Sequence, residues 1–222
     1  MPVFPGTEPP VFEQANTLEE NGFIEARITM YSHTGTHIDA PAHMFQDGRS
    51  LDEFPIEHFV GNASVLDFSS QEIKQIEVND LQKFEPLLTD MVEFVILRTG
   101  WSQYWGTPRY YDGFPYLTDE AATWLTQFNL KGIGIDAISI DVMDSTVFSV
   151  HKIFMQRNIL IVENLANLAS LDAPQFLFTV MPLKTKKADG SPARAIAMYG
   201  ACDREEIFES KSSLGGYMNE PK

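Results

Sequence analysis

Three of the five histidines in this 222-residue chain fall within eleven consecutive positions. The segment covers residues 33–43 and reads HTGTHIDAPAH. His33 and His37 have the spacing that would place two imidazoles on one face of a helix. A helix is disfavoured here, however, because the segment contains Gly35, two β-branched threonines and Pro41. An extended backbone is therefore the better prediction for this segment.

In an extended chain successive side chains point to opposite faces, so the odd-numbered positions share one face. Those positions include His33, His37, Asp39 and His43, and Gly35 leaves room for an ion between the first two imidazoles. The even-numbered positions carry small or apolar side chains that suit packing. Imidazole and carboxylate ligands suit Zn, Mn or Fe, and three ligands leave coordination positions open for water. We therefore expect His33, His37 and Asp39 to bind a divalent metal.

His43 follows Pro41, which ends regular strand pairing, so we expect His43 to lie in a loop beside the metal. Imidazole titrates near neutral pH, at a pKa of about 6.5. His43 is therefore predicted to be either a fourth ligand or a general base. A lone histidine is more often a hydrogen-bonded structural residue, and His58, next to Glu57, receives that interpretation.

The composition excludes several other kinds of function. The chain has 16 basic and 31 acidic residues and a formal net charge of −15, which disfavours nucleic acid and anionic membranes as partners. Its single cysteine, Cys202, rules out intrachain disulfides and zinc sites built from thiolates. We see no signal peptide at the start and no apolar run near the roughly 18 residues of a membrane span. The sequence therefore predicts a cytoplasmic enzyme or binding protein.

Short apolar runs alternate with segments of helical periodicity in the second half of the chain, whereas strands dominate the first half. The predicted strands cover residues 23–31, 59–68, 91–99, 133–137, 159–162, 176–181 and 193–199. The predicted helices cover residues 78–88, 118–128 and 145–156, with Thr118 as an N-cap. Residues 1–22 read as an extended arm and residues from about 205 to 222 as a polar tail. This pattern predicts a single mixed α/β domain over residues 1–222.

The segment HTGTHIDAPAH resembles the HxGTHxDxPxH signature of the cyclase family, which includes bacterial kynurenine formamidases and isatin hydrolases. The resemblance extends to VFPG at residues 3–6, LRTGW at 97–101 and GIDAISID at 134–141. It implies a compact swivelling β/β/α domain with mixed parallel and antiparallel sheets and flanking helices. It also implies a homo-oligomer of two or four copies.

The resemblance further implies a site for one or two Zn or Mn ions per subunit. The implied ligands are His33, His37, Asp39, His151 and Glu163. Asp39 would bridge an ion held by the two nearby histidines and a second ion held by His151 and Glu163. His43 would be the catalytic base or proton shuttle.

Together these observations predict a hydrolase that uses metal-activated water on a small amide, such as an N-formyl arylamine, a cyclic imide or a lactam. Two alternatives remain, namely a metal-dependent cyclase or lyase and a non-catalytic metal-binding protein. Residues 101–116 contain seven aromatic side chains. They are interpreted either as an aryl-binding wall or as a packed loop or subunit interface.

Overall fold

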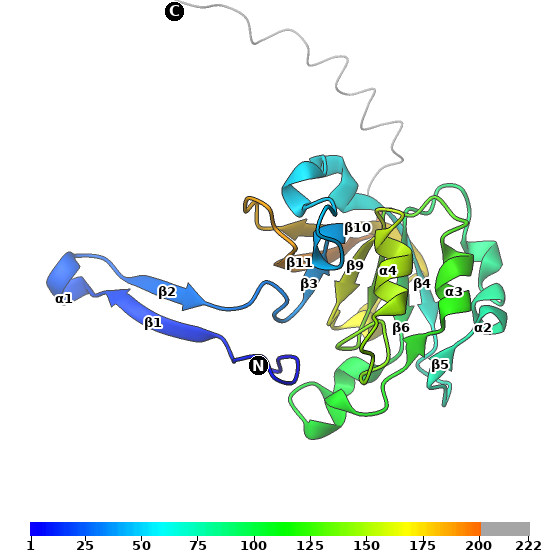
Figure 1. Cartoon of the computed structure of the whole chain (residues 1–222), viewed down its shortest axis with the longest axis horizontal. Helices are drawn as coiled ribbons and strands as arrows, with labels where there is room; N and C mark the ends of the chain where they lie inside the picture. Colours follow the sequence, from blue (N-terminus) through cyan, green and yellow to red (C-terminus); the bar gives the residue numbers. More distant parts are fainter. Residues whose placement is uncertain (201–222) are drawn as a thin grey trace, which may run out of the picture.

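The computed structural model describes residues 1–200, so the tail predicted from about residue 205 lies outside the described residues. Within that part seven strands close into a barrel (Figure 1). In chain order they are β3 (His37–Asp39), β4 (Val60–Asp67), β6 (Phe94–Arg98), β8 (Gly132–Ile135), β9 (Leu160–Glu163), β10 (Gln175–Pro182) and β11 (Gly190–Met198). Around the barrel the order is β10, β11, β3, β9, β8, β6 and β4. Strands β4, β6, β8 and β9 run parallel, whereas β3, β10 and β11 pair antiparallel with their neighbours. The mixed α/β prediction is confirmed.

Helices cover one side of the barrel (Figure 1). They are α2 (Val78–Gln82), α3 (Asp119–Leu125) and α4 (Ser149–Met155), and the small parallel pair β5 (Gln75–Ile76) and β7 (Tyr116–Leu117) lies next to them. The alternation of side chains along β6 divides the core in two. Phe94 and Ile96 belong to a hydrophobic core inside the barrel. Val95 and Leu97 belong to a second hydrophobic core, which lies between the sheet and the helices.

Each predicted helix occurs within its predicted range, but each is shorter than predicted. The segment predicted over residues 78–88 is an α-helix only as far as Gln82, and Pro86 then lies in a short 3-10 helix. Thr118 caps α3 as predicted, because its hydroxyl accepts a hydrogen bond from the backbone N–H of Ala121. The helix predicted from residue 145 begins only at Ser149.

Part of the region predicted as an extended arm, residues 1–22, pairs with the strand predicted over residues 23–31, and the resulting hairpin extends away from the barrel (Figure 1). The hairpin consists of β1 (Val11–Asn16), α1 (Leu18–Asn21) and β2 (Glu25–Thr29). Within residues 1–200, no helix is long and apolar enough to cross a membrane.

Candidate metal centre

Strand β3 is only three residues long, yet it places two of the predicted metal ligands on one face. Ile38 points into the barrel core and is fully buried, so its neighbours His37 and Asp39 face the opposite side. His37 is paired with Glu163 on β9, and Asp39 is paired with Gly190 on β11. The register therefore brings Glu163 next to His37, although the two are far apart in the sequence.

His33 reaches the same face from a turn rather than from a strand. Gly35 has a φ of 69°, a left-handed conformation that glycine adopts without a steric penalty. The turn carries the His33 ring over Gly190, where an added Cβ would lie only 2.4 Å from His33 Cε1. His33 Nδ1 then lies 2.6 Å from Asp39 Oδ1. The extended backbone predicted for residues 33–43 is therefore correct at 37–39 and wrong before it.

His151 enters the group from the first turn of α4. Its Nε2 lies 3.4 Å from Glu163 Oε1 and 3.7 Å from Asp39 Oδ2. On the other side, His37 Nε2 lies 3.2 Å from Asp39 Oδ1 and 3.6 Å from Glu163 Oε2. Three possible three-residue metal groups result. Asp39 belongs to two of them, one with His33 and His37 and one with His151 and Glu163, and the third consists of His33, His43 and Asp189. The structure thus brings together all five residues that the sequence proposed as ligands.

The second ring nitrogen of each of these histidines contacts an oxygen acceptor outside the group. The acceptors are Asp189 for His33, at 3.1 Å, the Gly35 carbonyl for His37, at 2.8 Å, and Asp141 for His151. Histidines that bind metals almost always donate their other N–H to a carboxylate or a carbonyl, which fixes the ring and raises its basicity. This arrangement leaves one nitrogen of each ring free to face the centre of the group.

The buried polar atoms of the group fit a cation. Among the described residues, no hydrogen bond reaches Asp39 Oδ2, although the atom is buried, and an unsatisfied buried polar atom costs about 1–3 kcal/mol. Burial alone would raise the pKa of Asp39, but His37 and His33 hold that pKa well below its usual value. Burial alone would lower the pKa of His33, yet Asp39 and Asp189 raise it to about 10. The group therefore favours positive charge at its centre, and its nitrogen and oxygen donors suit Zn or Mn.

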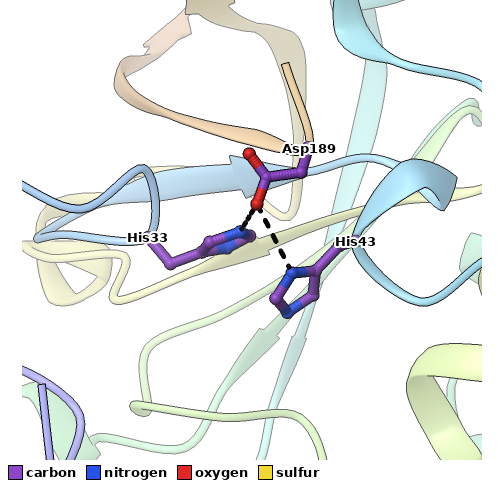
Figure 2. Close-up of side chains that lie close together, drawn as sticks. All are labelled: His33, His43 and Asp189. Carbon is purple, nitrogen blue, oxygen red and sulfur yellow. Dashed lines mark hydrogen bonds and ion pairs between the residues drawn. The ribbon is translucent and has the colours of Figure 1, made fainter. Parts of the chain in front are cut away.

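His43 lies at the edge of this group, at the end of a 3-10 helix (Pro41–His43) rather than in the expected loop. Figure 2 shows that the rings of His33 and His43 both approach the carboxylate of Asp189. The two ring centroids are 3.8 Å apart, and His43 Nδ1 lies 3.8 Å from Asp189 Oδ2. Burial lowers the pKa of His43, and the charge of His33 lowers it further. The neutral imidazole is therefore the favoured form of His43.

Asp189 is the residue that the sequence interpretation missed. It follows three lysines in the loop between β10 and β11 and looks like an ordinary surface acid. Its partner His33, which donates a hydrogen bond, lowers the pKa of Asp189 to about 2. Only the pairing of β11 with β3 brings this carboxylate to the histidines. That pairing could not be deduced from local sequence patterns.

A cavity of 310 Å³ opens over the histidines and carboxylates. Its aromatic walls are Phe4, Tyr31 and Phe148, and among the described residues that line it none belongs to the aromatic segment 101–116. That segment instead packs on the core, where Tyr110 is buried and its hydroxyl donates a hydrogen bond to Asn164. The packed-loop interpretation therefore fits these aromatic residues better than the aryl-wall interpretation.

Comparisons with known proteins agree with this geometry. Residues 1–142 match the family model described as "Putative cyclase". The chain belongs to the cyclase family. A kynurenine formamidase from Bacillus cytotoxicus is 35% identical over 194 residues, which cover 87% of this chain and 89% of that protein.

Solved structures of other proteins resemble this cyclase-family fold. Isatin hydrolase A from Labrenzia aggregata, bound to benzyl benzoate, has a TM-score of 0.80 and 27% identity, over 90% of this chain and 88% of that chain. A potential metal-dependent hydrolase with cyclase activity has a TM-score of 0.71 and 28% identity, over 88% and 90% of the two chains. This cyclase-family protein is a metal-dependent amide hydrolase.

We expect Asp189→Asn to weaken metal binding about 10–100-fold, the usual cost of losing a partner that orients a metal-bound histidine. The amide no longer supplies the negative charge that supports His33. Isothermal titration calorimetry with Zn or Mn measures the change in metal affinity. Asp172→Asn is the matched control, because Asp172 is an exposed acid outside the cavity. Equal affinities for the two variants would contradict the assigned role of Asp189.

Proposed function

We propose that this enzyme hydrolyses the formyl amide of an aromatic amine, with an isatin-like lactam as the next candidate. The proposal rests on the group of five possible ligands at the base of a cavity with aromatic walls. Flat aryl groups stack favourably on aromatic side chains. The kynurenine formamidase relative, at 35% identity, favours the formamide over the lactam.

His33, His37, Asp39, His151 and Glu163 would hold one or two divalent ions. An ion bound there supplies Lewis acidity and lowers the pKa of water from about 15.7 to about 7.

His43 would carry the proton in this reaction. Its Nδ1 faces Asp189, and no described residue forms a hydrogen bond with its Nε2, so that nitrogen is available at the cavity wall. His43 would accept the proton of the attacking water and return it to the departing amine nitrogen. Phe4, Tyr31 and Phe148 would hold the aryl ring and exclude water from it.

The decisive experiment is removal and restoration of the metal. We expect the protein stripped by a strong chelator to lose hydrolysis of N-formylkynurenine or formanilide, and Zn or Mn to restore it. Isatin serves as the alternative substrate, and metal content is measured at each step. Hydrolysis in ¹⁸O-labelled water places the label in formate, whereas elimination takes up no water. The ¹⁸O content of the product therefore distinguishes the two reactions. Full turnover by the metal-free protein would refute the proposal.

Several finer points stay predictions of the sequence. They are the identity and number of the ions, an assembly of two or four copies, the absence of nucleic-acid and membrane partners, and the cytoplasmic location. The enzymes among the relatives favour catalysis over the alternative of a non-catalytic metal-binding protein.

A further inference from the structure

Asn164 directly follows Glu163 at the end of β9 and lines the cavity over the metal centre. The residue is only 7% exposed, and its φ of 56° is a left-handed conformation that asparagine adopts more readily than most residues. Its backbone N–H donates a hydrogen bond to the carbonyl of Ala137, at 2.9 Å. Its carbonyl accepts one from the hydroxyl of Thr36, at 2.6 Å. These two bonds fix the position of the Asn164 backbone at the cavity wall.

The hydroxyl of Tyr110 determines how the side-chain amide of Asn164 is oriented. This hydroxyl lies 2.6 Å from Asn164 Oδ1. Burial raises the pKa of Tyr110, and the carboxylates of Asp136 and Glu163 raise it further, so the hydroxyl keeps its proton. Within residues 1–200 the hydroxyl has no other hydrogen-bond acceptor, so it donates to Asn164 Oδ1. The nitrogen Nδ2 is therefore the end of the amide that Tyr110 leaves free.

The aromatic segment 101–116 holds Tyr110 in place. Tyr110 lies in a 3-10 helix (Pro108–Tyr111) and is fully buried. The indole N–H of Trp101 donates a hydrogen bond to the Tyr110 carbonyl, at 3.0 Å, and the ring of Trp105 packs edge-on against the Tyr110 ring, with centroids 5.1 Å apart. Tyr110 does not line the metal cavity itself. The segment therefore reaches the cavity wall through the Tyr110 hydroxyl.

Asn164 Nδ2 has no acceptor among the described residues. It lies 3.4 Å from His37 Nδ1. That ring nitrogen is also 2.8 Å from the Gly35 carbonyl, and because a carbonyl can only accept, His37 Nδ1 carries the proton and donates it there. The contact between Nδ2 and Nδ1 therefore joins two donors and is not a hydrogen bond. Buried donors without an acceptor are rare, and an acceptor in the cavity would satisfy this one.

We propose that Asn164 Nδ2 donates a hydrogen bond to the carbonyl oxygen of the substrate amide, and that Tyr110 is the positioning residue that orients this donor. The carbonyl oxygen gains negative charge when water attacks the carbonyl carbon, so the hydrogen bond becomes stronger in the transition state. The inference rests on amide hydrolysis and not on the formyl amide in particular, because every amide substrate carries such an oxygen.

Asn164→Asp tests the donor. Aspartate keeps the shape of the side chain and an oxygen that accepts from Tyr110, but it has no N–H. We expect kcat on formanilide to fall about 10²–10³-fold with KM nearly unchanged, as for the loss of a donor that acts in the transition state. Asn167→Asp is the matched control, because Asn167 also has a left-handed φ, of 60°, but lies outside the metal cavity. An Asn164→Asp enzyme that keeps its kcat within about tenfold of the wild type would overturn the proposal.

A double-mutant cycle tests whether Tyr110 acts through Asn164. Asn164→Gly removes the amide without adding charge, and glycine adopts the left-handed φ without strain. We expect Tyr110→Phe to lower kcat in the wild type but to leave the kcat of Asn164→Gly unchanged, because that variant has no amide to orient. Tyr111→Phe is the matched control, since the Tyr111 hydroxyl forms no hydrogen bond within residues 1–200. Equal losses from Tyr110→Phe in both backgrounds would contradict the positioning role.

Metal content and thermal unfolding of each variant are measured together with turnover, so that loss of the metal or of the fold is not mistaken for loss of the donor. A wild type that hydrolyses isatin but not formanilide would refute the formyl substrate proposed above. The same variants compared on isatin would then still decide the role of Asn164.

Discussion

Asp39→Asn is expected to abolish hydrolysis and to remove metal from both halves of the centre. Asp39 belongs to two of the three possible metal groups, with Oδ1 2.6 Å from His33 Nδ1 and Oδ2 facing His151. The amide has nearly the same shape but lacks the negative charge that several imidazoles share. The loss of affinity should therefore exceed the roughly 10–100-fold effect of losing an outer partner of a metal ligand.

Metal content by mass spectrometry and turnover of a formanilide substrate measure this effect. Asp67→Asn is the matched control, since Asp67 also lies on a barrel strand but pairs with Arg98 at the surface. Thermal unfolding without metal tests whether the fold tolerates each change. An Asp39→Asn protein that keeps its metal and its turnover would show that the carboxylate is not a ligand.

The barrel strands were predictable from the sequence where successive side chains alternate between the core inside the barrel and the core under the helices. The apolar run predicted at residues 91–99 became β6, because Phe94 and Val95 pack on opposite sides of the sheet and both are fully buried. The spacing of apolar residues does not show where a helix or strand ends. The helix predicted over residues 78–88 stops early because Pro86 lacks the N–H that a continuing α-helix needs.

The site was predictable to the extent that its ligands follow one another in the sequence. His37 and Asp39 alternate with Ile38, so β-strand geometry alone gives them a common face. His33 joins them through a turn at Gly35 that the extended interpretation did not anticipate. Asp189 depends entirely on which strands pair, and pairing between distant segments leaves no local signature.

His43→Ala is expected to lower kcat about 10²–10⁴-fold, the usual contribution of a general base, while the protein keeps its metal. The metal should stay because His43 belongs to neither of the two groups that share Asp39, but only to the third group with His33 and Asp189. The pH profile gives an independent measurement. Burial and the neighbouring His33 lower the pKa of His43 below 6.5, so the base form persists at more acidic pH than for an ordinary histidine. We therefore expect kcat/KM of the wild type to fall only below about pH 6.5, as His43 becomes protonated.

His43→Ala should lose that acidic limb, because the group whose protonation causes it is gone. His58→Ala is the matched control, since the His58 ring packs against Phe54 outside the metal cavity, with the ring centroids 4.7 Å apart, and its loss should reduce stability rather than turnover. Loss of metal together with turnover in His43→Ala would identify His43 as a fourth ligand. Turnover within tenfold of the wild type would exclude His43 as the base, because positioned proton transfer accounts for at least about 10²-fold in rate.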